Sequence, residues 1–168
     1  MEVVVGLLAL LTLANIGLTV AVIRRLAAQE RRIAQLTTFT PPSGLAPGER
    51  VPAFIAETHG GERIDESVLA GGRAAVAFFS ATCEACAAHA PEFASVPGSK
   101  LAVLTGDGPS EATILGALAG VPVVREADVG PLASSFRVDT FPTYFAVEHG
   151  HVMAAAGSAD ELSELLAR

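Results

Sequence analysis

The amino-acid sequence predicts an α/β domain, with helices on both faces of one sheet, preceded by a single apolar N-terminal helix. Short apolar runs alternate with helical stretches over residues 51–168, which is typical of this fold class, and residues 3–23 contain no charge. The chain is 168 residues long, so one domain and an appendage fill its length. Its net charge of −7 gives no electrostatic reason to bind nucleic acid.

The apolar segment Val3–Ile23 is long enough to span a membrane. A helix of about twenty residues reaches ~30 Å, the thickness of the hydrocarbon core of a bilayer. A cleaved signal peptide would have a basic residue ahead of the apolar run, whereas Glu2 stands there. A buried core helix of this length would show a polar stripe, and none is visible. We therefore expect residues 1–23 to be an uncleaved transmembrane anchor in the lipid bilayer.

Residues 24–50 are predicted to connect this anchor to the domain. Residues 24–36 continue as a juxtamembrane helix, and the linker Thr37–Glu49 contains Pro–Pro and Pro–Gly pairs that break regular structure. Arginines follow the apolar segment, and no Lys or Arg precedes it. Taken alone, the positive-inside rule would place the domain in the cytoplasm. The rule is a bias that long domains can override, so these residues leave the orientation open.

The domain itself, residues 51–168, begins with a predicted hairpin. The segment Phe54–Thr58 precedes the turn signal Gly60-Gly61 and forms the first strand of that hairpin. The run Ala74–Phe79 is apolar at every position, as expected for a strand that is buried on both faces. A helix over residues 83–93 follows this strand.

Two further strands and two helices are expected after this helix. Lys100–Thr105 is a second apolar strand, and Ser110–Ala119 is a second helix. Val121–Val124 is a third strand, and Gly130–Phe136 is a short helix. This alternation of strands and helices predicts a sheet with parallel strands.

The chain closes with a second hairpin and an amphipathic helix. The strands Thr143–Glu148 and His151–Ala156 flank Gly150. The last helix begins after Ser158, a residue suited to capping, and presents leucines on one face. Together these elements predict one domain over residues 51–168.

The two cysteines of the chain stand as Cys83-Glu84-Ala85-Cys86, directly after a predicted buried strand and at the start of a helix. The free N–H groups and the positive dipole at a helix N-terminus stabilise an anion, so we expect a lowered pKa for the Cys83 thiol. Cys86 lies one turn further in, shielded and close enough to form a disulfide with Cys83. Thiol–disulfide exchange requires such a pair, so the sequence predicts a redox-active Cys83–Cys86 disulfide and no other cofactor.

A metal site is the competing interpretation of the same residues. Cys83, Cys86 and His89 would bind zinc together with His149 or His151. His89, however, lies about 240° around the helix from Cys83 and faces away from the cysteine pair. Haem attachment needs a histidine directly after the second cysteine, where this chain has an alanine. These observations favour redox chemistry over a metal site.

Two motifs resemble the thioredoxin fold: FFSATCEAC at residues 78–86, with Pro91 after it, and TFPT at residues 140–143. With the leading segment PGERVPAF, the chain is most similar to membrane-anchored TlpA-type thiol–disulfide oxidoreductases and related redoxin-domain proteins. The resemblance extends over roughly residues 45–168. It implies a thioredoxin-like fold in which a central mixed sheet is flanked by helices. Pro91 either kinks the helix that bears the cysteines or ends it.

The resemblance also implies a role for each matched residue. Cys83 would be the nucleophile and Cys86 the resolving cysteine. Pro142 would be a cis-proline that faces the cysteines, and the backbone of Phe141 before it would hydrogen-bond an extended substrate. Thr82 stands where the family usually has tryptophan, so we expect a remodelled substrate platform at this residue.

Two departures from the family bear on the redox poise. Ala77 occupies the place where thioredoxins bury a carboxylate that assists the resolving cysteine, and Glu84 or Glu92 would be weak substitutes. Glu84 next to the nucleophile disfavours the Cys83 thiolate, so its pKa should fall less than in strong oxidants of the DsbA type. We therefore expect a reductant or an isomerase rather than an oxidase.

The expected function is that of a membrane-tethered enzyme that reduces or isomerises disulfides of protein substrates. An external thiol donor, such as a membrane thiol carrier, would reduce the oxidised pair again. The anchored members of the family face outward, so we expect an extracytoplasmic domain at the cell membrane, although the arginines argue for the opposite.

Other functions remain open. One is a dedicated assembly factor for one disulfide-rich client, similar to accessory proteins of methylamine utilisation. Another is a peroxiredoxin-type peroxidase, but its P-x-x-x-T-x-x-C signature needs Pro and Thr where Val76 and Ser80 stand. A nearly inactive binding module is the third.

Overall fold

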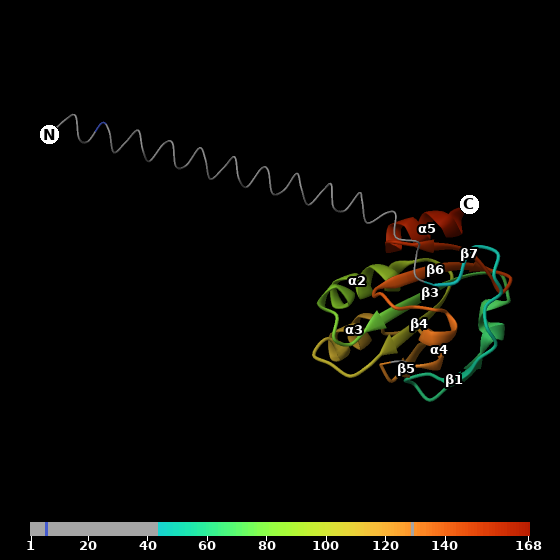
Figure 1. Cartoon of the computed structure of the whole chain (residues 1–168), viewed down its shortest axis with the longest axis horizontal. Helices are drawn as coiled ribbons and strands as arrows, with labels where there is room; N and C mark the ends of the chain where they lie inside the picture. The colour runs from blue at the N-terminus through green and yellow to red at the C-terminus, as the bar shows by residue number, and fades with distance from the viewer. Residues whose placement is uncertain (1–5, 7–43, 129) are drawn as a thin grey trace. The chain divides into compact units, whose positions relative to one another are not determined.

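The computed structural model describes residue 6, residues 44–128 and residues 130–168. The chain divides into two compact units, Met1–Pro41 and Pro42–Arg168, and the second is the α/β domain (Figure 1). The predicted anchor and juxtamembrane helix lie outside the described residues, apart from Gly6. Among the residues that are described, no helix is both long and apolar enough to cross a bilayer.

A five-stranded mixed sheet forms the centre of the domain, in the order β5-β4-β3-β6-β7 (Figure 1). The strand β3 (Arg73–Ser80) pairs parallel with β4 (Ser99–Thr105), which pairs parallel with β5 (Val123–Glu126). On its other side β3 pairs antiparallel with β6 (Thr143–Glu148), and β6 pairs antiparallel with β7 (His151–Ala156). The strand that precedes the cysteines is therefore the central strand of the sheet.

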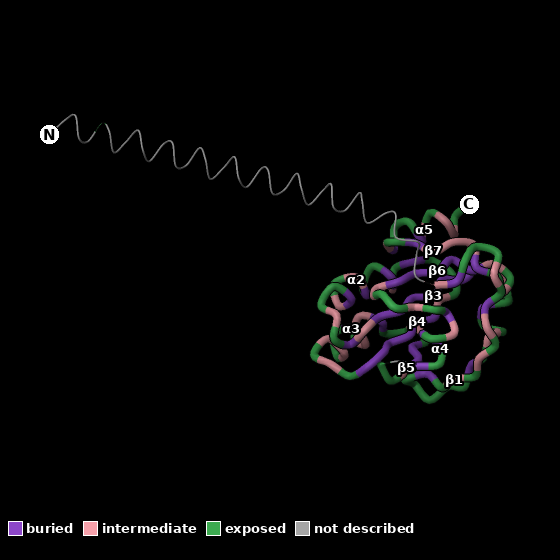
Figure 2. Tube along the Cα trace, in the orientation of Figure 1, coloured by how far each residue is buried: buried purple, intermediate pink, exposed green. Residues whose placement is uncertain are grey.

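Successive residues of β3 pack into two different cores, because side chains of a strand alternate between the two faces of a sheet. Ala75, Ala77 and Phe79 belong to one buried cluster, which also contains residues of α2 (Glu84–Ser95), α3 (Glu111–Ala117) and α5 (Ala159–Ala167). We call this the α2 face. Strand residues lie buried at the middle of the domain in Figure 2.

The opposite face, which we call the α4 face, holds the other set of β3 side chains, Ala74, Val76 and Phe78. They pack with residues of α4 (Pro131–Ser135) and of the segment that leads into β3. That segment contains a separate two-stranded sheet of β1 (Ile55–Glu57) and β2 (Arg63–Asp65), followed by the 3-10 helix η2 (Glu66–Leu69). Both faces of the central sheet are thus covered, as the apolar run in β3 predicts.

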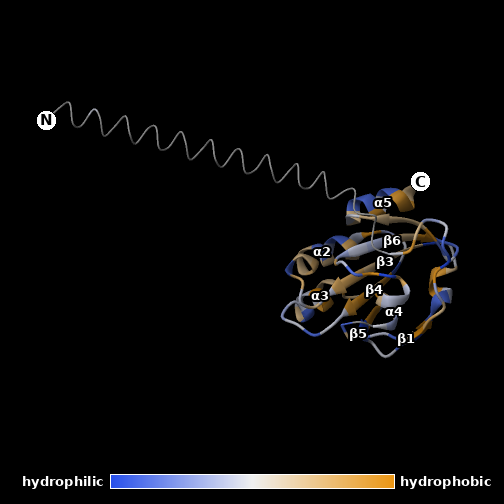
Figure 3. Cartoon of the chain, viewed as in Figure 1, coloured by the Kyte–Doolittle hydropathy of each residue, from blue (hydrophilic) through white to orange (hydrophobic). Residues whose placement is uncertain are grey.

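Most of the predicted elements are present, with shifts at their ends. Both strands of the C-terminal hairpin have the predicted bounds, and Ser158 caps α5 by accepting a hydrogen bond from the Glu161 N–H at 3.2 Å. Hydrophobic and hydrophilic residues alternate along α5, as its amphipathic pattern requires (Figure 3). The predicted helix over residues 110–119 is shorter at both ends, at Glu111–Ala117.

Two predictions around prolines are corrected. The strand predicted at Val121–Val124 begins two residues later, because Pro122 has no N–H to donate to a strand ladder, and β5 then continues to Glu126. The alternative that the helix after the cysteines ends at Pro91 is wrong. The helix α2 continues through Pro91 to Ser95.

Candidate active site

Cys83 lies between the end of the central strand β3 and the start of the helix α2, at the carboxyl edge of the parallel strands. It is the N-cap residue of α2, with extended backbone angles, and its sulfur accepts a hydrogen bond from the Cys86 N–H at 3.2 Å. The side chain is half-buried. The Cys83 sulfur therefore lies at the start of the helix, beside its free N–H groups and at the positive end of the helix dipole.

Cys86 lies one turn further along α2 and is fully buried on the α2 face. Its sulfur accepts a hydrogen bond from the Ser80 N–H at 3.5 Å. Burial, together with the neighbouring Cys83 side chain, raises the pKa of the Cys86 thiol to about 12. The structure therefore combines one accessible sulfur with one that is shielded, and both cysteines are free thiols.

The loop before β6 brings Phe141 to the cysteines from far away in the sequence. The Phe141–Pro142 peptide bond is cis, and the Phe141 carbonyl oxygen lies 3.8 Å from the Cys83 sulfur, which donates to it. The Thr143 hydroxyl donates to the Thr140 carbonyl at 2.6 Å within the same loop. Phe141 and Pro142 are both half-buried, so part of each residue is exposed to solvent.

Thr82 lies directly before Cys83 and is exposed. Its hydroxyl oxygen is 3.0 Å from that of Ser80, and its N–H donates to the Ser80 hydroxyl oxygen at 3.4 Å. Thr82 therefore presents a small polar side chain at the rim of the site, next to the half-buried sulfur.

The backbone before Cys83 rests against a second loop that the sequence interpretation missed. The Ser110 N–H donates to the Ala81 carbonyl at 3.0 Å. At Gly108 an added Cβ would lie 2.5 Å from the same carbonyl oxygen, which no side chain tolerates. Gly108 is thus needed for the close approach of the two loops. The signal in the sequence was a glycine three residues after the end of a predicted strand.

Neither carboxylate that was expected to substitute at the position of Ala77 bonds to a cysteine. The carboxylate of Glu92 lies 2.7 Å from Nδ1 of His89, on the exposed side of α2, and Glu84 is exposed in the first turn. Ala77 is fully buried and pairs across the sheet with Tyr144 of β6. Tyr144 is the second residue that the sequence interpretation missed, although it is the only tyrosine of the chain.

The cysteine and histidine side chains that were considered as zinc ligands do not lie together in the structure. Within residues 44–128 and 130–168, no three His, Cys, Asp or Glu side chains are placed to hold a metal ion together. His151 instead has its Nδ1 3.2 Å from the carbonyl oxygen of His149 in the turn between β6 and β7.

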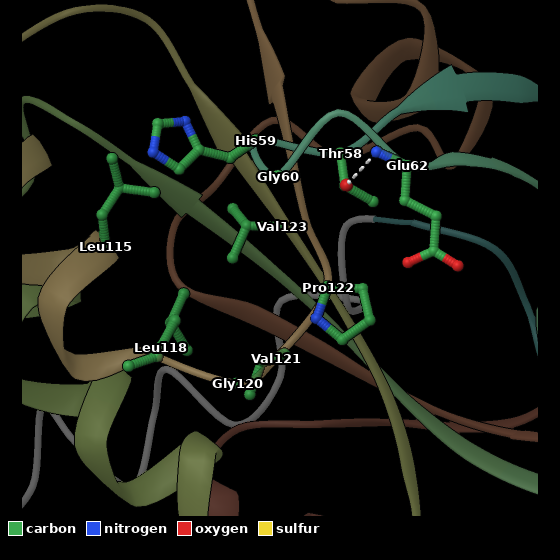
Figure 4. A pocket seen from close by; sticks show the side chains of 11 residues that line it. Thr58, His59, Gly60, Glu62, Leu115, Leu118, Gly120, Val121, Pro122 and Val123 are labelled. Carbon is green, nitrogen blue, oxygen red and sulfur yellow. Dashed lines mark hydrogen bonds between the residues drawn. The ribbon is translucent and has the colours of Figure 1, made fainter.

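A separate cavity of about 310 Å³ lies between the β1–β2 turn and the segment that follows α3 (Figure 4). The His59 ring and the side chains of Leu115 and Leu118 line it, and the Glu62 N–H donates to the Thr58 hydroxyl at its edge at 3.1 Å. None of the predicted site residues lines this cavity, so it is distinct from the cysteine site.

No protein-family model and no curated protein matches the chain. Several solved structures are similar. A secreted disulfide oxidoreductase of Mycobacterium tuberculosis, homologous to Escherichia coli DsbE, has 22% sequence identity and a TM-score of 0.58, covering 68% of this chain and 94% of that one. DsbF of the same organism has 24% identity and a TM-score of 0.60, covering 68% and 92%.

An exposed lipoprotein thioredoxin of Streptococcus pneumoniae is similar as well, with 16% identity and a TM-score of 0.57, covering 69% of this chain and 98% of that one. At sequence identities this low, the structural similarity establishes a shared fold. The domain has a mixed α/β thioredoxin-like fold, with a central sheet flanked by helices, as the sequence motifs led us to expect.

Proposed function

We propose that the chain is a membrane-tethered thiol–disulfide oxidoreductase that reduces or isomerises protein disulfides through Cys83 and Cys86. The observation that supports this most strongly is the pair itself. A half-buried sulfur caps a helix and accepts the Cys86 N–H at 3.2 Å, while a fully buried thiol lies one turn below it. The similar solved structures include the secreted Mycobacterium tuberculosis protein that is described as a disulfide oxidoreductase, which is consistent with this proposal.

The reaction proceeds in two exchanges. The Cys83 thiolate attacks one sulfur of a substrate disulfide, and the other substrate sulfur leaves as a thiolate, so that a mixed disulfide remains. Cys86 then attacks the Cys83 sulfur, the substrate is released with two thiols, and the Cys83–Cys86 disulfide forms. The chain contains two cysteines, so an external thiol donor has to reduce the pair again.

An extended segment of the substrate would bind at the cis-proline loop. The Phe141 carbonyl already lies 3.8 Å from the Cys83 sulfur, so a chain that pairs with this backbone would bring its own disulfide to the nucleophile. Thr82 faces the same rim and leaves it open, because a threonine covers less area than a tryptophan. These three residues, Thr82, Phe141 and Pro142, form the proposed substrate-binding rim.

The proposed direction is reduction. Glu84 places an exposed carboxylate directly after Cys83, and we expect a negative charge at this end of the pair to favour the disulfide over the reduced pair. A redox titration of the full-length chain in mild detergent, with insulin reduction assayed beside it, tests this. We expect a potential below about −200 mV together with insulin turnover that is lost in Cys83→Ser. A potential near about −120 mV would identify an oxidant instead.

The same assay separates the alternatives. A pair that cycles between thiol and disulfide but leaves insulin intact would favour an assembly factor for a single client. Rapid oxidation of Cys83 by hydrogen peroxide would favour a peroxidase. If Cys83→Ser leaves the cellular function unchanged, the domain is a binding module.

We further propose that residues 1–23 anchor the protein in the cell membrane, with the domain on the extracytoplasmic side. The uncharged run Val3–Ile23 supports the anchor, and a membrane thiol carrier would then be the natural electron donor. Reporter fusions after Leu36 and at the C-terminus test the orientation. Reporter activity confined to the cytoplasm would contradict it.

A further inference from the structure

The hydroxyl of Tyr144 is buried and lacks a hydrogen-bond partner among the described residues. The residue lies in β6 and is fully shielded from solvent. An unpaired hydroxyl in a protein interior is unfavourable, and native structures contain few of them. A phenylalanine would fill the same space without that cost, so the hydroxyl at this position calls for an explanation.

Tyr144 shares its surroundings with Cys86. Both belong to the buried cluster on the α2 face, and of the buried members of that cluster these two have titratable side chains. The ring of Tyr144 is stacked on Phe93 of α2, with centroids 6.1 Å apart, and meets the edge of Phe79 at 6.1 Å. Its partner across the sheet, Ala77, has no polar atom in its side chain.

The titratable groups that act on Tyr144 come from α2 and from its N-cap residue. Burial raises the pKa of the Tyr144 phenol, and negative charge at Cys86, then at Glu92 and Cys83, raises it further. The neighbouring strands β3 and β7 and the helix α5 contribute apolar side chains to this cluster. Tyr144 therefore keeps its proton at neutral pH and can donate it in a hydrogen bond.

We propose that Tyr144 is a positioning residue whose hydroxyl donates a hydrogen bond to the sulfur of Cys86 when that sulfur becomes a thiolate. This inference rests on the proposed function. In the dithiol state the hydroxyl is unpaired, and in the thiolate state it gains a charged acceptor. The interaction therefore lowers the free energy of the reacting state more than that of the resting state.

The step it assists is the second exchange. The Cys86 thiolate attacks Cys83, the bond between Cys83 and the substrate sulfur breaks, and the Cys83–Cys86 bond forms. The two cysteines are oxidised and the substrate is reduced by two electrons. The proton that Cys86 lost ends on the departing substrate thiolate, and Tyr144 keeps its own.

A stopped-flow reaction of the reduced full-length chain with dithiobis-nitrobenzoate separates the two exchanges. The first release of coloured thiolate depends on reagent concentration and reports Cys83, whereas the second is independent of concentration and reports Cys86. We expect Tyr144→Phe to slow the second phase about tenfold, the effect of losing a hydrogen bond to a charged group, and to leave the first phase unchanged. An unchanged second phase, or equal slowing of both phases, overturns the proposal.

Phe145→Leu is the matched control, because Phe145 is the next residue of β6 and its side chain lies on the α4 face. It should lower stability and leave the ratio of the two phases as in the wild type. If the first phase is absent in the wild type, the proposed function fails. If both phases are present and Tyr144→Phe does not change the second, only the present inference fails.

A second measurement needs no substitution at Tyr144. The chain contains one tyrosine and no tryptophan, so its intrinsic emission reports Tyr144 alone. In a Cys83→Ala variant this emission should change as pH rises through the ionisation of Cys86, in step with the ultraviolet absorbance of the thiolate. Emission that stays constant through that ionisation overturns the proposal even where Tyr144→Phe fails to fold.

Discussion

Among the residues that the structure describes, each face of the central sheet has three fully buried aromatic rings, and four of these six rings come from adjacent positions of the same two strands. On the α4 face Phe78, Phe136 and Phe145 have centroids 5.1 to 5.9 Å apart. On the α2 face Phe79, Phe93 and Tyr144 have centroids 5.9 to 6.1 Å apart.

The chemistry of the two ring clusters differs, although their packing is alike. The α4 face contains phenylalanines that stabilise the fold. The α2 face adds Cys86 and the Tyr144 hydroxyl to the same kind of packing. The comparison leads us to expect that the proposed redox chemistry depends on the α2 face, and that the α4 face can be altered without changing it.

Removing a ring from the α4 face should have the largest effect on stability. We expect Phe136→Ala to lower the free energy of unfolding by about 3–5 kcal/mol, because it leaves a cavity in a fully buried cluster. The redox potential of the cysteine pair should stay within about 30 mV of the wild type. Urea unfolding and titration in glutathione buffers measure the two quantities, and Phe136→Leu serves if the alanine variant does not fold. A large change in potential would break the distinction between the faces.

The buried Cys86 thiol on the α2 face should make the reduced protein less stable as the pH rises into the alkaline range. Cys86 has a pKa of about 12 in the folded protein against its usual 9.0, so the unfolded state binds fewer protons between these values. The contribution of Cys86 to stability is therefore fully present below about pH 9, and the free energy of unfolding falls as the pH rises from about 9 to about 12.

The raised pKa of Tyr144 adds to this loss in the same direction. Urea unfolding of the reduced protein at several alkaline pH values measures the slope. In Cys86→Ala, only the pH dependence of stability that is due to Tyr144 should remain. An equal slope in wild type and Cys86→Ala would mean that the buried thiol has no special environment.

The loop that contains Gly108 packs against the backbone before Cys83, and we expect the next largest effect from a substitution there. Gly108→Ala should cost about 1–3 kcal/mol, because the new Cβ would lie 2.5 Å from the Ala81 carbonyl oxygen and one of the two loops has to move. It should also alter the reactivity of Cys83. The control Gly116→Ala lies within α3 with open space around it, and we expect it to be neutral or to stabilise by up to about 1 kcal/mol. Equal effects of the two substitutions would refute the close contact.

The smallest expected effect on stability is that of Tyr144→Phe. Removing a buried hydroxyl without a partner should leave the stability of the reduced protein within about 1 kcal/mol of the wild type, and raise it if anything. Urea unfolding checks this against Phe136→Ala on the other face. A loss of about 2 kcal/mol or more would show that the hydroxyl has a partner in the folded state.

The sequence predicted the strands well because short, continuous apolar runs are typical of strands that are buried on both faces of a sheet. Ala74–Phe79 lies within β3, and the C-terminal hairpin has the predicted bounds. The third strand was displaced by Pro122, since a missing N–H matters more than apolar character at the end of a strand. The N-cap position of Cys83 also followed from local sequence.

The rest of the site depends on contacts between distant segments. The approach of Phe141 to Cys83 was expected only from a family resemblance, because no local pattern links residues so far apart. Gly108 and Tyr144 were missed for the same reason. A glycine after a strand and a tyrosine within one acquire their significance only from the loop that approaches the first and the buried cluster that the second shares with Cys86.

Trapping a mixed disulfide tests the central claim most directly. In a Cys86→Ser variant, Cys83 should attack a disulfide-bonded protein such as insulin and remain joined to it, because the resolving thiol is gone. Non-reducing mass spectrometry should then identify an adduct through Cys83, whereas Cys83→Ser should form none. An adduct through Cys86 in the Cys83→Ser variant, or equal trapping by both variants, would contradict the assignment of Cys83 as the nucleophile.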